Sequence, residues 1–436
     1  MIGTPPLATP PGAERWHMRA SSISETVEKL SQIWSNVARR AESGEMTEGE
    51  QALLREESYL RTEFGARLET GREVRIRTRT SVLTLIVIAP GSETTERAMA
   101  TVSALAARHP SRAIVVSPGD PDGPSSFGAH IYAACQLASG GSTEICTEEI
   151  LIRTGGELSQ HLATAVAPLL IHDLPVVLWW PDDVPFGSAM FRGLATESDR
   201  LLVDCGQFRG NGASRLVGMR KAVGEGLVVH DIGWMRAMLW RELLAAIFDH
   251  PLLTPELAAI RSVRIDVARP GNQMRLARGA MFLGWMAAVL HWEVVKPIAP
   301  DGDTYRGLLK SGKREISVEL RPVSTALDGS VRTAGSLVRV DVMAEHPRAT
   351  TRIRVTRQAD HLLGTADWNG AQVVRRAARL DVFDEMPFLA DALDRSGRDR
   401  WFERALDRTT DLMRDLAVED EALHARPAAP ALGAGA

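Results

Sequence analysis

The sequence contains little cysteine. Its 436 residues include only Cys135, Cys146 and Cys205, which are too few for a disulfide scaffold and are typical of a reducing compartment. The N-terminal stretch MIGTPPLATPPGAER places proline and glycine where a secretory signal peptide needs a continuous apolar stretch. These two absences exclude the class of small disulfide-rich secreted proteins, and we expect a cytoplasmic protein.

A long apolar run and an excess of charge of one sign are also missing. The longest apolar stretch, 276–295, contains Arg278, His291 and Glu293, so it falls short of the ~18 uninterrupted apolar residues of a membrane span. The 51 basic side chains nearly balance the 55 acidic ones, and net charge therefore predicts no attraction to nucleic acid or anionic lipid. We expect neither a membrane nor a nucleic acid as partner.

The motifs of common enzymes and metal sites are absent as well. The first buried strand ends in APGS instead of the G-x-G-x-x-G that lets a pyrophosphate approach the backbone, and no Walker A motif, H-E-x-x-H, C-x-x-C or G-x-S-x-G occurs. Gly155-Gly156 before a helix is a weak signal for an anion site. Adjacent Asp182 and Asp183 do not by themselves supply the convergent geometry of an acid–base pair. We expect no cofactor, no metal and no catalysis.

The length of the chain and its apolar share of 44 % fit about two or three domains with sizeable cores. Residues 1–20 and 425–436 are rich in proline, glycine and alanine and predict flexible tails. A helical arm is expected over 21–70: Ser22 and Glu25 have capping-box spacing, and Ile23, Val27, Leu30, Trp34 and Val37 form one apolar stripe. This stripe either packs on the body of the protein or docks on a partner.

The remaining patterns predict two domains of different class. Residues 71–225 alternate between buried strands, such as SVLTLIVIA and SRAIVVS, and helices, which indicates an α/β Rossmann-like domain with parallel strands. Residues 226–424 contain helices followed by strands with period-two alternation, which indicates an α+β domain with a mainly antiparallel sheet. Alternating Arg352, Arg354 and Arg357 fit a solvated sheet face better than a nucleic-acid site.

One predicted hairpin places two cysteines opposite each other. If Gly140-Gly141 is a two-residue loop, counting outward pairs Cys135 with Cys146, within reach of a disulfide. The pair is either a redox switch or two small buried side chains.

The most distinctive segment is LIHDLPVVLWWPDDVPF at 170–186. Consecutive Trp179 and Trp180 at a strand end point to opposite faces of the sheet. One can fill the core, while the other lies at the edge where open α/β sheets form their binding crevice. Neighbouring helices cover both indoles, or else the indoles form a partner surface together with Pro181, Asp182 and Asp183.

This segment, followed by SDRLLVDC, resembles the signature of the OpcA family. Further stretches agree in order: SVLTLIVIAP, HPSRAIVVSP, EEILIRTGG and WRELLAAIFDHPLLTPELAAIRSVRI. Cys205 departs from the small serine-like residue expected there. The resemblance covers about residues 20–380.

The resemblance implies a protein that binds glucose-6-phosphate dehydrogenase, the entry enzyme of the oxidative pentose phosphate pathway. Its role would be to promote assembly or allosteric activation of that enzyme, with no catalytic residues of its own. The partner-binding candidates are Trp34 and the segment from Trp179 to Asp183. The alternative is an enzyme that acts on a sugar phosphate or nucleotide at the carboxyl edge of the α/β sheet.

Overall fold

The structure is a computed structural model that describes residues 14–43, 76–79, 81–106, 108–137, 143–271, 273–324, 333–380 and 386–418. The chain divides into two compact units. Unit 1 takes in Met1–Pro181, Ser188–Leu202 and Glu385–Arg395, and unit 2 takes in Asp182–Gly187, Val203–Asp384 and Ser396–Ala436. The predicted helical content of 44–66, the Gly140-Gly141 loop and the tail at 425–436 lie outside the described residues.

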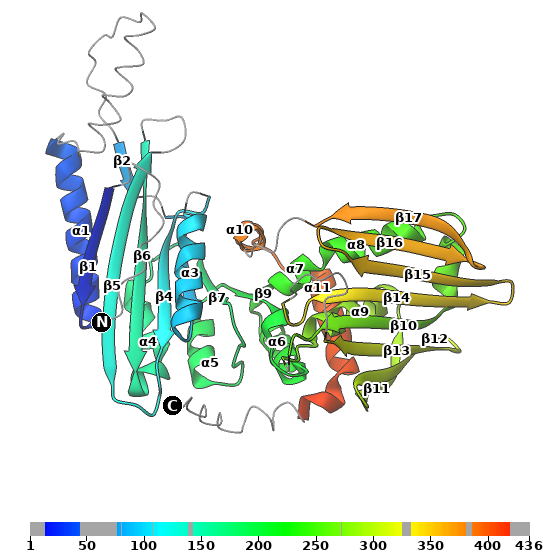
Figure 1. Cartoon of the computed structure of the whole chain (residues 1–436). Coiled ribbons are helices and arrows are strands. Elements are labelled where there is room, and N and C mark those ends of the chain that lie inside the picture. Colours follow the sequence, from blue (N-terminus) through cyan, green and yellow to red (C-terminus); the bar gives the residue numbers. More distant parts are fainter. Residues whose placement is uncertain are drawn as a thin grey trace, which may run out of the picture. The chain divides into compact units, whose positions relative to one another are not determined.

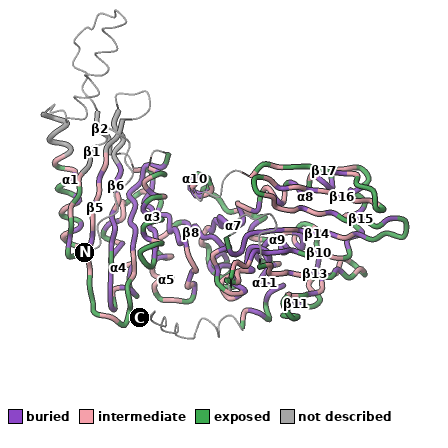
Figure 2. The backbone as a smooth tube through the Cα atoms, viewed as in Figure 1, coloured by how far each residue is buried: buried purple, intermediate pink, exposed green. Residues whose placement is uncertain are grey.

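Unit 1 is built on a mixed sheet with the strand order β1-β5-β6-β4-β3-β7-β8, in which β2 also pairs with β6 (Figure 1). The strands are β1 (Glu14–Ala20), β2 (Ile76–Arg79), β3 (Leu83–Ile88), β4 (Ser111–Pro118), β5 (Ser126–Leu137), β6 (Thr143–Gly155), β7 (Val176–Trp180) and β8 (Arg200–Val203). Strand β3 is parallel to β4 and β7, and β4 is parallel to β6. All six residues of β3 are buried, as expected for a strand covered on both faces, and Figure 2 shows buried residues gathered in the middle of this sheet. The predicted parallel pairing is confirmed.

Among the described residues of unit 1, six shorter segments are helical besides α1. They are α3 (Ser92–Leu105), η1 (Gly156–Ser159), α4 (Leu162–Val166), η2 (Ala167–Leu169), α5 (Ala189–Thr196) and α10 (Met386–Asp394). Helix α10 comes from the far end of the chain, and its Asp391 and Asp394 bind Arg108. Unit 1 therefore includes one helix, α10, that is distant in sequence from the rest of the unit.

Helix α1 (Ile23–Ser43) begins where the capping box predicts. Ser22 Oγ accepts the Glu25 N–H at 3.2 Å, and Glu25 Oε2 accepts the Ser21 N–H at 2.7 Å. Leu30 of the predicted stripe is buried, and the helix contacts β1 and β5. Part of the stripe therefore packs on the body of the protein, while Val27 is 37 % exposed and Trp34 is half-buried, so docking of this helix on a partner stays a prediction.

Residues 14–20, predicted as part of a flexible tail, form β1 and pair antiparallel with β5. The correction has a simple cause: Ala20 is buried while the neighbouring Arg19 is exposed, so the segment has the alternation of a strand. The long partner β5 supplies the hydrogen bonds that a tail would lack.

The predicted cysteine register is confirmed at the level of the backbone. Cys135 lies opposite Cys146 in the antiparallel β5–β6 ladder. A redox role for the pair stays a prediction.

Unit 2 contains an eight-stranded sheet in the order β11-β12-β13-β10-β14-β15-β16-β17. Its strands are β10 (Ile260–Ala268), β11 (Glu293–Asp301), β12 (Thr304–Ser311), β13 (Arg314–Val323), β14 (Leu337–His346), β15 (Ala349–Arg357), β16 (His361–Trp368) and β17 (Ala371–Arg379). Neighbouring strands are antiparallel except β10 and β13, which are parallel. The predicted antiparallel character is confirmed.

The remaining elements of unit 2 are η3 (Cys205–Gln207), α6 (Ala213–Gly224), β9 (Val228–Asp231), α7 (Ile232–Arg236), α8 (Met238–Phe248), η4 (Thr254–Ala259), α9 (Ala277–Val289) and α11 (Arg400–Leu412). Helices α8 and α9 cover one face of the eight-stranded sheet, and α11 packs on α9. The helical residues after the last strand form two helices, α10 and α11, with Ser396 and Gly397 between them. The boundary predicted at 225 follows directly on α6 and lies within unit 2.

No described helix combines the length and the apolar character that crossing a membrane requires.

Candidate functional site

The two consecutive tryptophans, which the sequence predicts to be either covered or part of a partner surface, are buried. Trp179 and Trp180 expose 1 % and 2 % of their surface, and the Trp180 ring lies 6.1 Å from that of Phe191 in a tilted contact. Pro181 is buried as well. In this conformation both tryptophans are core residues, as the interpretation in which they are covered predicts, and a partner-binding role for this segment stays a prediction.

Asp182 and Asp183 are held in ion pairs of unit 2. The Asp183 carboxylate takes both Arg215 Nε, at 3.1 Å, and Arg215 Nη2, at 3.2 Å, while Asp182 lies 3.7 Å from Arg209. The Asp183 N–H also donates to Asp182 Oδ1 at 2.8 Å. This is the arrangement of a salt-bridged loop, and it gives no support to an acid–base pair.

Gly155-Gly156 forms a packed corner. The Gly156 N–H donates to the Asp120 carbonyl at 2.9 Å, and a Cβ on Gly155 would lie 2.5 Å from Ser126 Oγ. Gly156 also needs its positive φ of 64°. Close packing and turn geometry explain both glycines without an anion.

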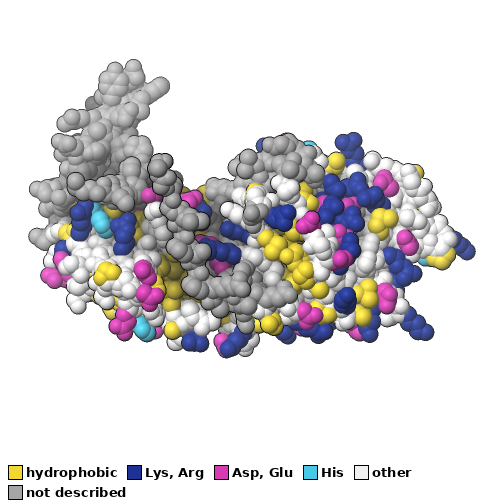
Figure 3. All heavy atoms as spheres, turned by 60° about the horizontal axis from the view of Figure 1, so that its bottom comes forward, with side chains coloured by type: hydrophobic (Ala, Val, Ile, Leu, Met, Phe, Trp, Pro, Cys, Tyr) yellow, Lys and Arg dark blue, Asp and Glu magenta, His cyan; other side chains and the backbone are white. Residues whose placement is uncertain are grey.

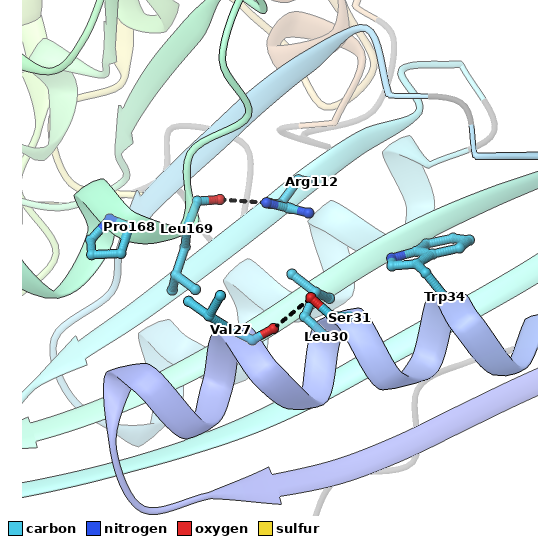
Figure 4. A pocket seen from close by; sticks show the side chains of 7 residues that line it. All are labelled: Val27, Leu30, Ser31, Trp34, Arg112, Pro168 and Leu169. Carbon is cyan, nitrogen blue, oxygen red and sulfur yellow. Dashed lines mark hydrogen bonds between the residues drawn. The ribbon is translucent and has the colours of Figure 1, made fainter.

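Trp34 lines a cavity of about 320 Å³ in unit 1. The walls are Val27, Leu30, Ser31 and Trp34 of α1, together with Arg112, Pro168 and Leu169. Figure 4 shows the α1 side chains directed toward Arg112 and the η2 residues. The wall combines five apolar residues with Ser31 and Arg112, so the cavity suits a small molecule or side chain that is partly apolar and partly polar.

Arg112 is the charged member of this cavity, and its own unit fixes it in place. Its Nε lies 2.6 Å from Glu148 Oε2, and its Nη1 donates to the Leu169 carbonyl at 2.7 Å. The Glu148 side chain is fully buried, so the pair is held away from water on that side. The cavity therefore presents one guanidinium edge, and the hydroxyl in its wall, Ser31 Oγ, donates to the Val27 carbonyl at 3.1 Å.

A buried charge cluster in unit 2 was not predicted from the sequence. Asp204 follows β8 and Asp231 ends β9, and both are 1 % exposed. Arg278 Nη2 donates to Asp204 Oδ1 at 2.8 Å, and Arg236 Nη1 donates to Asp204 Oδ2 at 3.2 Å. Asp231 Oδ1 accepts the N–H groups of Cys205 and Gly233 at 2.9 and 2.8 Å. The sequence signal was the repeated Asp-x-Gly that follows two buried strands.

The surroundings shift the pKa values of Asp204, Asp231 and Cys205 in different directions. Burial opposes ionisation of Asp204, but the charges of Arg278 and Arg236 hold its pKa below the usual value. Burial and the Asp204 charge raise the pKa of Asp231 to about 6. Burial, with both carboxylates, raises the pKa of the Cys205 thiol well above its usual value.

The ligand atoms of Asp204, Cys205 and Asp231 lie within 4.8 Å of one another. They fit a metal poorly, because Arg278 already neutralises Asp204 and the thiol holds its proton. The cluster is best explained as a structural ion pair that anchors two strand ends.

The raised pKa of Asp231 predicts a pH dependence of stability. Because the folded-state pKa, about 6, exceeds the ordinary value of 3.8, the stabilisation is complete below about pH 4 and is lost as pH rises through about 6. Asp231→Asn keeps the accepting oxygen and should abolish this loss, which is on the order of 2–3 kcal/mol. Urea unfolding of both proteins between pH 4 and pH 8 measures it. Parallel pH profiles of the two proteins would contradict the assignment.

Two family profiles match this chain. The profile described as glucose-6-phosphate dehydrogenase subunit N-terminal domain matches residues 86–219, and the corresponding C-terminal domain matches residues 227–406. Together they cover well over half of the 436 residues. This chain belongs to the OpcA family.

Curated OpcA relatives agree with this assignment. An OxPP cycle protein OpcA of Nostoc punctiforme is 27 % identical over 319 residues, which is 71 % of this chain and 66 % of the relative. The OxPP cycle protein OpcA of Synechocystis is 25 % identical over 308 residues, which is 69 % of this chain and 63 % of the relative. The OpcA-family chain thus spans less than two thirds of the length of these relatives.

Solved structures resemble this OpcA-family chain only remotely. A 3-ketoreductase from Actinomadura kijaniata has a TM-score of 0.39 and 13 % identity, covering 76 % of this chain and 96 % of its own. Gal80p from Saccharomyces cerevisiae has a TM-score of 0.41 and 9 % identity, covering 79 % and 97 %. Such distant likenesses carry no inference about activity.

Proposed function

We propose that this OpcA-family chain binds glucose-6-phosphate dehydrogenase and promotes its assembly or allosteric activation in the cytoplasm, without catalysis of its own. The observation that carries the proposal is the match of both halves of the chain, 86–219 and 227–406, to domains described as those of a glucose-6-phosphate dehydrogenase subunit. The relatives named as OxPP cycle proteins support the same pathway.

The side-chain chemistry is compatible with a binding role. Each carboxylate that the sequence singled out is engaged in an ion pair, and the buried Asp204 cluster has no open side for a substrate. An activator needs only to bind the active state of its partner more tightly than the inactive one. Of the predicted contact residues, Trp34 is the indole that faces a cavity, and we propose it as a partner contact.

The proposal predicts a defined complex with the dehydrogenase of the same organism. Size-exclusion chromatography with light scattering should show both proteins in one peak, with a mass that exceeds either protein alone. Trp34→Ala is the first variant to compare, and Trp401→Ala, an indole 52 % exposed in unit 2, is the matched control. Separate peaks at micromolar concentrations of both wild-type proteins would contradict the binding role.

A further inference from the structure

One face of the eight-stranded sheet in unit 2 is turned away from the helices. A Cβ on Gly364 of β16 would meet Leu243 and Ile247 of α8, and a Cβ on Gly279 of α9 would meet Ile265 and Val267 of β10. These contacts fix the covered face, and the alternate residues of each strand form the opposite one. We call this opposite side the open face.

The open face carries rows of charged side chains that run across the strands. The central row is given by the strand register as Arg375, Thr365, Arg354, Asp341, Arg264, Glu319 and Arg306, from β17 to β12. With the two flanking rows it contains seven arginines, Arg264, Arg306, Arg321, Arg339, Arg352, Arg354 and Arg375, and four carboxylates, Asp266, Glu319, Asp341 and Asp367. Within these three rows the arginines exceed the carboxylates by three, and toward the strand ends the same face also carries Lys310 and Arg379 together with Glu315 and Glu345.

Three of the carboxylates lie beneath the arginines that they bind. Each of these carboxylates forms ion pairs with two arginines: Asp266 with Arg321 and Arg339, Asp341 with Arg352 and Arg354, and Glu319 with Arg264 and Arg306. These carboxylates are 2, 6 and 16 % exposed, whereas the arginines are between 26 and 59 % exposed. The guanidinium groups are thus more exposed than these three carboxylates, although Arg306 also pairs with Asp301, which is 56 % exposed. Figure 3 shows Lys and Arg side chains gathered on unit 2 with Asp and Glu among them.

The size of the open face suits a protein interface. Eight strands spaced at about 4.8 Å, each about eight residues long, give roughly 34 by 27 Å. The resulting area, about 900 Å², is close to the ~800 Å² that one partner contributes to an interface of standard size.

The charge of the open face selects among possible occupants. A second copy of this chain related by a two-fold axis would bring two positive faces together, and like charges oppose association. Nucleic acid is disfavoured because a surplus of three positive charges is small beside the ~6–10 phosphate contacts that typical nucleic-acid-binding proteins make. The net charge of the whole chain, −4, also opposes binding of a polyanion. An acidic protein surface is complementary to the face.

We infer that the open face docks an acidic surface of a partner protein, which, resting on the proposed function, is glucose-6-phosphate dehydrogenase. Carboxylates of the partner would bind the outward guanidinium groups bidentately. The complex should therefore form faster and bind more tightly at low ionic strength.

The test adds negative charge to the open face and leaves every buried carboxylate paired with its arginines. Thr356 lies opposite Arg339, and Thr365 lies opposite Arg354 and Arg375, so Thr356→Glu with Thr365→Glu gives each new carboxylate an arginine neighbour. We expect the double variant to keep its melting temperature and to bind the dehydrogenase at least about tenfold more weakly at low salt. Arg375→Glu, at an exposed position of β17, should weaken binding in the same direction.

The matched control is Thr101→Glu with Thr196→Glu, which adds the same charge to unit 1, at the half-buried Thr101 of α3 and the exposed Thr196 of α5, and should leave binding within about twofold. If the wild-type protein binds the dehydrogenase and the open-face variants bind it equally well, the inference that the open face is the docking site is wrong, while the proposed function stands. If wild-type protein does not bind, both fail. The inference would also be overturned if the open-face variants bound the dehydrogenase as well as the wild-type protein but lost self-association or binding to a duplex oligonucleotide.

Discussion

Replacing Arg278 by methionine is expected to lower the free energy of unfolding by about 3–5 kcal/mol, because removing one partner of a buried ion pair leaves an uncompensated charge. Arg278 is 7 % exposed, and the Asp204 carboxylate that it binds is 1 % exposed. Arg236, the second cation on Asp204, lies at 3.2 Å and is more exposed, so it offsets only part of the loss. Urea denaturation of wild-type protein and variant measures the difference.

Two further variants isolate the buried charge as the cause. Asp204→Asn with Arg278→Met removes both charges and keeps the oxygen that accepts the Gly206 N–H, so it should recover most of the lost stability. Arg220→Met breaks an exposed pair with Asp407 at 2.8 Å and should cost about 1 kcal/mol or less. An Arg278→Met variant as stable as Arg220→Met would contradict the structural role of the cluster.

The second large effect concerns the packing of α9 on α11. A Cβ on Gly284 would lie 2.0 Å from Thr409 Oγ1 and 2.6 Å from the Ala405 carbonyl oxygen. Rotation of the Thr409 side chain cannot relieve the contact with a backbone atom, so the helices must move apart. We expect Gly284→Ala to cost about 2–3 kcal/mol, measured as a lower midpoint of thermal unfolding.

The control for this variant is another glycine in a helix of the same unit. Gly224 ends α6 and has no atom within 4 Å of its added Cβ, so Gly224→Ala should be neutral or stabilise the protein by up to about 1 kcal/mol. Equal losses at Gly284 and Gly224 would show that helix propensity, and not close packing, governs both positions.

Local patterns predicted most elements of the fold. The buried run LTLIVI, the capping box at Ser22 and the cysteine register between β5 and β6 depend on neighbours in sequence or on one hairpin, and each was predicted correctly. Strand β1 was missed because proline-rich neighbours masked a short alternating segment whose partner lies more than a hundred residues away. The assignment of α10 to unit 1 was missed because it depends on a contact with α3 that no local pattern encodes.

The candidate site was less accessible from sequence. Exposure of Trp179 and Trp180 depends on what the rest of the chain places over a strand end, and the structure buries both indoles. The Asp204 cluster joins residues at 204, 231 and 278, which only the fold brings together. By contrast, the arginine rows of β15 were visible as alternation, while their carboxylates on β10, β13 and β14 required the strand register.

The most direct test of the central claim is the initial rate of the same organism's glucose-6-phosphate dehydrogenase, measured with and without this protein over a range of glucose-6-phosphate concentrations. The account predicts a raised kcat or a lowered KM that saturates as the protein reaches the dehydrogenase concentration, and no turnover by this protein alone. Unchanged kinetics at saturating concentrations of a folded protein would contradict it and would bring an enzymatic role for this chain to the front.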